Sequence, residues 1–147
     1  MKPFKQPVSV LVVIYTVAGE VLLLERADRP GYWQSVTGSR EGDEALIDTA
    51  RREVFEETGL VAAPPALDDW GQTNRYEIYP HWRHRYAPGV THNDEHVFGL
   101  CLPAVVPVRL APGEHLAWRW LSWSDAAQQV FSPSNAEALR QLPQRLG

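Results

Sequence analysis

Hydrophobic residues form short runs in the first forty positions, and turn residues separate these runs. Positions 8–15 are an apolar run rich in valine and isoleucine, which is typical of a strand covered on both faces. A turn at 18–20 leads into a second apolar run at 21–25, and Pro30-Gly31 precedes a short extended segment at 33–36. The pattern therefore predicts extended structure for most of this part of the chain.

Between positions 43 and 58 the spacing of apolar residues becomes helical, and Gly59 stands where a glycine commonly ends a helix. A surface loop with two adjacent prolines follows at 62–69. We expect one side of the helix to pack against the sheet through Leu46, Ile47, Ala50 and Val54.

The second half of the chain again alternates strands and helices. Strands interleaved with one long and two short helices predict one domain, residues 1–147, of the α+β class, with a mixed β-sheet flanked by helices. The expected elements are a strand pair at 72–85, strands at 96–102 and 117–121, and helices at 124–130 and 135–142 with Ser124 and Ser134 as N-caps.

Composition narrows the functional classes. The chain has 147 residues, with 14 Lys and Arg against 18 Asp and Glu, so its net charge is −4. A mildly acidic domain lacks the field that non-specific binding to nucleic acid or an anionic membrane requires, so an anionic ligand needs a local cation. No stretch reaches the ~18 apolar residues of a membrane span, and we expect a soluble cytoplasmic protein. Cys101 is the single cysteine, which excludes a disulfide framework and favours an inert thiol in a buried strand.

Seven of the 18 acidic residues lie between positions 38 and 60. Glu53, Glu56 and Glu57 have the spacing that places them on a narrow arc of one helix, where like charges repel. A hard divalent cation such as Mg²⁺ would compensate this repulsion, and Arg52 could reach back to Glu44 to orient the carboxylates. From spacing alone, a solvated charged face of a surface helix explains the pattern equally well.

A wider pattern surrounds these carboxylates. Gly38 is followed after five residues by Glu44, and after seven more by the segment REVFEETGL at 52–60. At every fixed position, residues 38–60 resemble the signature, or box, of the Nudix hydrolases. That resemblance implies an α/β/α sandwich in which the box forms a loop, a helix and a loop. It also implies hydrolysis of nucleoside diphosphates linked to another group.

The resemblance also implies a metal site and a catalytic set. The metal would be Mg²⁺, with Mn²⁺ as a substitute. The resemblance does not specify which carboxylate activates the attacking water. Residues 33–38, 84–91 and 114–117 resemble the branch of the family that releases pyrophosphate from 7,8-dihydroneopterin triphosphate in folate biosynthesis. On this likeness the metal ligands are Glu53, Glu56, Glu57 and Glu114, and the catalytic residues are Arg52, Glu53 and Glu56. The substrate-binding residues are Lys5, Arg26, Thr37, Gly38, Tyr76, Glu77, Ile78, Tyr79 and Ser132.

Other functions remain open on the sequence. One alternative is a general (deoxy)nucleoside triphosphate pyrophosphohydrolase, and another is a nucleotide-sensing Nudix domain without catalysis, which the intact box carboxylates disfavour. Without the resemblance, Glu114 is a strand-edge charge, and tyrosines in strands usually pack. The small-molecule triphosphate is the one partner we expect, and the oligomeric state is not predicted. The segment from 81 to 96 predicts a basic, aromatic loop over an anionic substrate. An ordinary solvated loop is one alternative, and a zinc site formed by His81, His84, His92 and His96 is another.

Overall fold

A mixed sheet of seven strands organises residues 3–146, the part of the chain that the computed structural model describes. Residues 1, 2 and 147 of the predicted domain lie outside the described residues. Within 3–146, no helix is both long enough and apolar enough to cross a membrane. The elements are β1 (Val8–Thr16), β2 (Glu20–Arg26), β3 (Trp33–Gln34), β4 (Val36–Ser39), α1 (Leu46–Thr58), β5 (Leu67–Glu77), the 3₁₀ helix η1 (Pro80–Arg85), β6 (His92–Leu102), β7 (His115–Ser122), α2 (Trp123–Gln129), α3 (Pro133–Arg140) and α4 (Leu142–Leu146).

Strand β1 lies at the centre of the sheet. It runs parallel to β6 over its whole length, from the pair Val8 and Asp94 to the pair Thr16 and Leu102. On its other side β1 pairs with β2 only at the tip of their hairpin, and antiparallel β4 takes over the rest of that edge. Strand β2 instead pairs along its length with β7. This arrangement brings the end of β4 next to α1.

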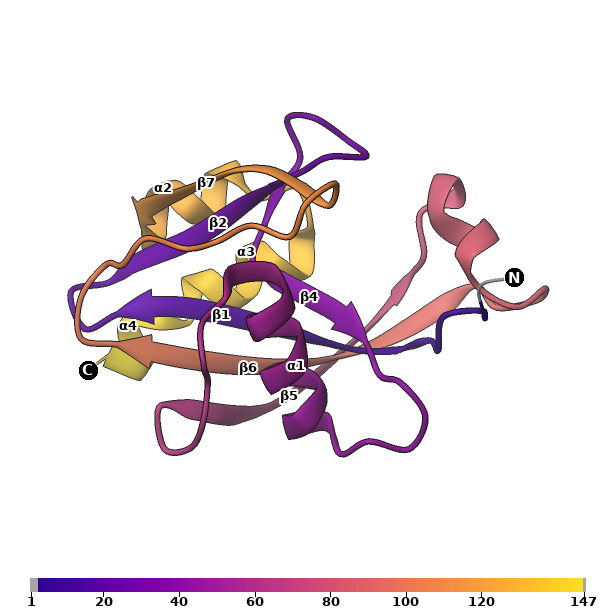
Figure 1. Ribbon diagram of the computed structural model, residues 1–147, viewed down its shortest axis with the longest axis horizontal. Coiled ribbons are helices and arrows are strands. Elements are labelled where there is room, and N and C mark those ends of the chain that lie inside the picture. Colours follow the sequence, from indigo (N-terminus) through magenta and orange to yellow (C-terminus); the bar gives the residue numbers. More distant parts are fainter. Residues whose placement is uncertain (1–2, 147) are drawn as a thin grey trace.

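Helices cover both faces of the sheet (Figure 1). Successive side chains of a strand point to opposite faces, so β1 contributes to two cores. Val10, Val12 and Ile14 pack with Ala50 and Val54 of α1. Leu11, Val13 and Tyr15 pack on the other face with residues of α2, α3 and α4, including Ala126, Leu139 and Leu142. The predicted α/β/α sandwich, with α1 packed through its apolar side, is confirmed.

The prediction for residues 62–85 is wrong in two respects. Leu67 belongs not to a surface loop but to the start of β5, where it is buried. The expected strand pair is a single strand that ends at Glu77 and is followed by η1. Pro80 has no backbone N–H and suits the first turn of a helix, which explains why η1 forms here in place of a second strand.

The predicted helix boundaries also need correction. Helix α1 begins at Leu46, three residues after the predicted start, because the Glu44 side chain is hydrogen-bonded within the preceding loop. The N-caps of α2 and α3 are Ser122 and Ser132, whose side chains accept hydrogen bonds from the backbone N–H groups of Asp125 and Asn135. They replace the predicted Ser124 and Ser134. Cys101 is half-buried at the edge of the core and not fully enclosed.

Candidate active site

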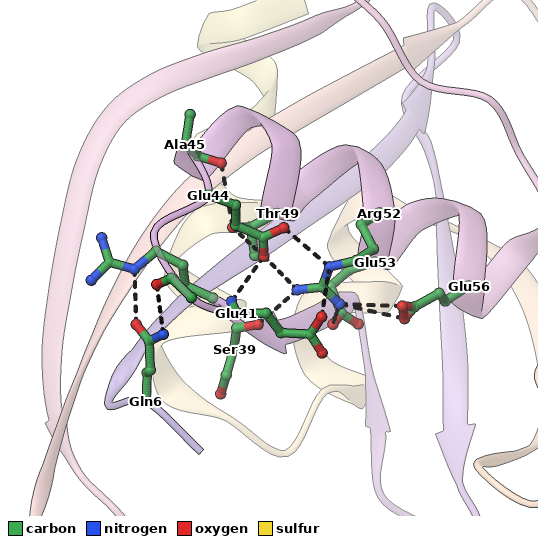
Figure 2. Close-up of polar contacts among 11 residues, drawn as sticks. Gln6, Ser39, Glu41, Glu44, Ala45, Thr49, Arg52, Glu53 and Glu56 are labelled. Atoms are coloured by element: carbon green, nitrogen blue, oxygen red, sulfur yellow. Dashed lines mark hydrogen bonds and ion pairs between the residues drawn. The ribbon is translucent and has the colours of Figure 1, made fainter. Parts of the chain in front are cut away.

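Arg52 of α1 holds together the loop between β4 and α1 (Figure 2). Its guanidinium donates to Glu44 Oε1 at 2.7 Å and to the backbone oxygen of Ser39 at 2.9 Å. It also donates to Glu53 Oε1 at 2.7 Å and to Glu56 Oε1 at 3.2 Å. The predicted contact between Arg52 and Glu44 is therefore present. One arginine fixes a carboxylate of the loop and two carboxylates of the helix.

The predicted carboxylates point in different directions from α1. Glu57 is 3% exposed and lies inside the protein, whereas Glu56 is exposed beside Arg52. The carboxyl group of Glu53 lies against the backbone of Gly38 in β4, where a Cβ atom would overlap it. Gly38 is thus required by the position of Glu53, and the Glu53 and Glu57 carboxyls lie close enough for each to affect the pKa of the other.

The buried pair formed by Glu53 and Glu57 has too little positive charge around it. Burial raises the pKa of the Glu57 carboxyl well above its ordinary value, and the nearby Glu53 and Glu114 carboxyls raise it further. Burial also raises the pKa of Glu53, although its bond to Arg52 opposes this. A cation bound beside these two adjacent carboxyls would stabilise their ionised forms.

Oε1 of Glu57 is buried and has no hydrogen-bond partner among the described residues. Nε2 of His115 lies 3.5 Å away. Burial, together with the charge of Arg26, lowers the pKa of His115 to about 4, so its ring is neutral at pH 7 and supplies no charge. Within 3–146, no three His, Cys, Asp or Glu side chains are already grouped for a metal ion. The residues nevertheless fit Mg²⁺, which proteins commonly hold through one or two carboxylates together with substrate phosphates.

A cavity of about 330 Å³ opens beside these carboxylates. It is large enough for a small ligand, since ligand pockets are commonly about 300–1,000 Å³. All nine residues that the sequence analysis assigned to substrate binding line this cavity: Lys5, Arg26, Thr37, Gly38, Tyr76, Glu77, Ile78, Tyr79 and Ser132.

Positive side chains lie where the cavity approaches the carboxylates. Lys5, Arg26 and Arg85 all line the cavity. Burial and the neighbouring Arg85 lower the pKa of Lys5, while Glu53 and Glu57 partly offset this. The charge of Lys5 therefore interacts with both the arginines and the carboxylates, and the three cations suit a polyanionic ligand.

A carboxylate from the loop after β2 holds η1 over the cavity. Asp28 accepts hydrogen bonds from Arg26 and Arg85 at 2.8 Å and from the indole N–H of Trp82 at 3.1 Å. The Arg26 guanidinium also lies 4.3 Å from the centre of the Trp82 ring. These contacts, Arg26 foremost, hold the pKa of Asp28 well below its usual range. The sequence analysis did not identify Asp28, because two of its partners, Trp82 and Arg85, lie more than fifty residues away along the chain.

Aromatic side chains form one wall of the cavity. Tyr79 and Trp82 pack edge to face with ring centres 5.6 Å apart, and Phe131 lies 5.7 Å from Trp82 and 6.1 Å from Tyr79. Tyr79 is 36% exposed, so part of its ring is open to solvent. Trp82 and Phe131 were not predicted as site residues, although the aromatic character of the segment after position 81 was noted.

A second polar cluster lies on the α3 side of the sheet, and sequence reasoning missed it. Asn93 and Glu95 of β6 are buried and line the cavity. They alternate along a strand that was predicted to begin only at His96, so their common face was not recognised. The amide of Asn93 donates to Ser9 Oγ at 2.7 Å and to the hydroxyl of Tyr76 at 3.0 Å.

The histidines between 81 and 96 are not gathered into a zinc site in the described part of the chain. His81 and His84 belong to η1, whereas His92 and His96 belong to β6. Nδ1 of His96 lies 3.1 Å from Thr73 Oγ1, and Nδ1 of His92 lies 2.9 Å from Thr91 Oγ1. The alternative that these histidines bind zinc is therefore dropped.

Comparison with known proteins identifies the family. The model of the NUDIX domain matches residues 5–142. The chain belongs to the Nudix family. The dihydroneopterin triphosphate diphosphatase of Escherichia coli (strain K12) is 47% identical over 144 residues, which cover 96% of this chain and 95% of that protein. The enzyme of the same name from Haemophilus influenzae is 43% identical over 145 residues, with 95% and 89% covered.

The fold agrees with this membership. The structure of the E. coli dihydroneopterin triphosphate pyrophosphohydrolase matches this one with a TM-score of 0.89 and 45% identity, covering 95% of this chain and 97% of that chain. Nudix hydrolases use divalent metal ions. Residues 38–60, which resemble the Nudix box, run from β4 through the loop between β4 and α1, and through α1 to Leu60. Gly59 ends α1 in a left-handed conformation and donates to Phe55, as predicted.

Proposed function

We propose that the chain hydrolyses 7,8-dihydroneopterin triphosphate to the monophosphate and pyrophosphate, with Mg²⁺ as its metal. The position of Gly38 carries this proposal, because Gly38 lines the cavity and also contacts the Glu53 carboxyl. A ligand whose ring occupies the cavity can therefore extend its phosphates to the carboxylates. The two diphosphatases described above support the choice of substrate, since the similarity covers nearly the whole of this chain.

The cations and polar groups of the cavity would bind the triphosphate chain. Lys5 offers three N–H donors, and Arg26 offers those of its five that its hydrogen bonds to Asp28 and Gln34 leave free. An arginine matches phosphate oxygens in a forked geometry. Thr37 and Ser132 line the same cavity and add hydroxyl groups. Burial of Lys5 strengthens its attraction for phosphate, because little water remains to screen its charge.

Glu53 and Glu57 would be the main ligands of the metal, and Glu56 and Glu114 would be further ligands at the edge of the site. Arg52 positions Glu53 and Glu56 through its hydrogen bonds. A divalent cation supplies positive charge that neutralises phosphate oxygens and favours attack by water. A carboxylate of the box, for which Glu53 and Glu56 are our candidates, accepts a proton from the attacking water. The water oxygen forms a bond to phosphorus, the bridging P–O bond between the α phosphate and the two terminal phosphates breaks, and the products are the monophosphate and pyrophosphate.

The proposal is tested with purified protein, Mg²⁺ and four substrates: 7,8-dihydroneopterin triphosphate, dATP, diadenosine tetraphosphate and ADP-ribose. Pyrophosphate is measured for the two triphosphates, and chromatography resolves the products of the other two. We expect the highest kcat/KM on the pterin substrate and no turnover in EDTA. A kcat/KM on dATP equal to that on the pterin would replace the proposal with a general nucleoside triphosphate pyrophosphohydrolase. Binding without turnover of any compound would contradict catalysis.

A further inference from the structure

Glu95 is a buried carboxyl in the wall of the cavity, away from the metal-binding candidates. It is 4% exposed and lies on the face of the sheet that α3 covers, whereas Glu53 belongs to α1 on the other face. Its Oε1 accepts a hydrogen bond from the Ser134 hydroxyl at 2.8 Å and a longer one, 3.4 Å, from the Asn74 amide. These two donors come from α3 and β5, and they fix the orientation of the carboxyl group.

The hydrogen-bonding capacity of Glu95 is only half used. Its Oε2 makes no hydrogen bond, and no Lys or Arg forms an ion pair with it, in the portion of the chain that the structure covers. Burial raises the pKa of the Glu95 carboxyl, and the hydrogen bonds from Ser134 and Asn74 oppose this effect. Leaving a buried carboxylate without partners is costly, and a ligand that donates hydrogen bonds removes the cost.

The neighbouring Asn93 is also buried with an acceptor oxygen that lacks a donor among the described residues. It is 1% exposed, and its Oδ1 has no hydrogen-bond partner among the described residues. Asn93 and Glu95 lie two positions apart on β6, so their side chains share one face. Both line the cavity. The cavity therefore presents two neighbouring side chains whose acceptor oxygens are not fully used by donors of the described residues.

We propose that Glu95 determines which ring the cavity accepts, by taking two hydrogen bonds from adjacent N–H groups on one edge of a 2-amino-4-oxopyrimidine ring. This inference rests on the proposed function, because it names the part of the same substrate that the cavity recognises. The pterin ring carries a ring N–H beside an exocyclic amino group, and guanine has the same edge. Adenine and cytosine place an acceptor nitrogen beside their amino group, so a carboxylate cannot pair with both positions.

The surroundings of Glu95 suit a flat ring. Tyr76 and Tyr79 also line the cavity, and the ring centre of Phe131 lies 6.1 Å from that of Tyr79. Aromatic faces hold flat heterocycles by stacking, but they do so for every base and do not discriminate among them. Discrimination then falls to the polar edge, where Glu95 is the charged acceptor.

The first test compares Glu95→Gln with the wild type on two substrates. Glutamine keeps the shape of the side chain but replaces one acceptor oxygen with a donor. We expect kcat/KM for 7,8-dihydroneopterin triphosphate to fall about 10- to 100-fold, the range for hydrogen bonds to a charged group, while kcat/KM for dATP stays within about threefold. Equal loss on both substrates, or no loss on the pterin, would overturn the inference.

Asp94→Asn is the matched control for this substitution. Asp94 immediately precedes Glu95 in β6, points to the other face and forms a 3.7 Å ion pair with Arg75 at the surface. Its substitution removes the same charge one position away. We expect no change on either substrate, because Asp94 does not line the cavity. A loss of pterin selectivity in Asp94→Asn as large as that in Glu95→Gln would show a general charge effect and contradict the inference.

A binding experiment without metal separates this inference from the proposed reaction. Pterin and lumazine are titrated into wild type and Glu95→Gln, with fluorescence as the readout and circular dichroism confirming the fold. Neither compound has a side chain, and lumazine carries an oxo group in place of the 2-amino group of pterin. We expect the wild type to prefer pterin at least about tenfold and Glu95→Gln to lose that preference. That result without any pterin turnover would refute the reaction alone, whereas turnover with an unchanged preference in Glu95→Gln would refute the ring recognition alone.

Discussion

Replacing Arg52 with glutamine removes the group that links the β4–α1 loop to α1. Arg52 and Glu44 are both about four-fifths buried, and their closest contact is 2.7 Å. Hydrogen bonds from Arg52, first among several contacts, lower the pKa of Glu44 from its ordinary 4.5 to about 2. The substituted side chain is neutral and shorter, so we expect the Glu44 carboxylate to lose its main partner and its pKa to return towards the ordinary value.

The size of the effect follows from this pKa. A fall from 4.5 to about 2 corresponds to about 3.4 kcal/mol of stability. Glu44 retains some contact with water, which reduces the expected loss to about 2 kcal/mol at pH 7. Because the folded-state pKa is lowered, this stability is present above pH 4.5 and disappears as the pH falls towards 2. At pH 3 we therefore expect less than about half of the difference to remain.

Urea unfolding of the wild type and Arg52→Gln at pH 7 and pH 3, in EDTA to exclude metal ions, measures these differences. Arg140→Gln is the control, because Arg140 forms only an exposed 3.8 Å pair with Glu137. This control is expected to change the free energy of unfolding by less than about 1 kcal/mol at both pH values. A difference between wild type and Arg52→Gln that is equal at pH 7 and pH 3, or absent at pH 7, would refute this reasoning.

Other substitutions test separate parts of the structure. Gly38→Ala places a Cβ where the Glu53 carboxyl lies, so kcat in a steady-state assay is expected to fall about 100-fold with the thermal midpoint little changed; normal turnover would contradict the tight contact. Gly99→Ala directs a Cβ into the Trp70 ring on the paired strand, so urea unfolding is expected to show a free energy of unfolding lower by about 1–3 kcal/mol. A variant as stable as the wild type would contradict this close contact. Asp28→Asn weakens the contacts that hold η1, so KM for the triphosphate is expected to rise about tenfold while kcat changes less; an unchanged KM would show that η1 does not need Asp28.

Local patterns in the sequence predicted the elements that local physics determines. The apolar run at 8–15 predicted β1, because a strand buried on both faces needs apolar residues at successive positions. The helical spacing and Gly59 predicted the end of α1 correctly. The start of α1 was missed, because the Glu44 side chain binds Arg52 and the Glu41 N–H in the loop before the helix. A glutamate whose carboxylate accepts hydrogen bonds within a loop cannot be told from sequence apart from a glutamate in the first turn of a helix.

The parts of the site that depend on distant contacts could not be predicted. Spacing placed Glu53, Glu56 and Glu57 on one arc, but the packing of α1 on the rest of the fold decides that Glu57 is buried and Glu56 exposed. Glu95 was missed because its partner Ser134 lies 39 positions away, on a helix that covers the sheet. The resemblance to the Nudix family located the residues that line the cavity, which spacing alone left open.

Binding of Mn²⁺, followed by its electron paramagnetic resonance signal, tests most directly whether Glu57 and its neighbours hold a metal ion. The comparison is between the wild type, Glu57→Gln and Glu137→Gln, which alters an exposed carboxylate on α3. We expect the wild type and Glu137→Gln to bind Mn²⁺ equally, and Glu57→Gln to bind it at least about tenfold more weakly with its fold intact. Equal Mn²⁺ affinity in all three proteins would contradict the account of this site.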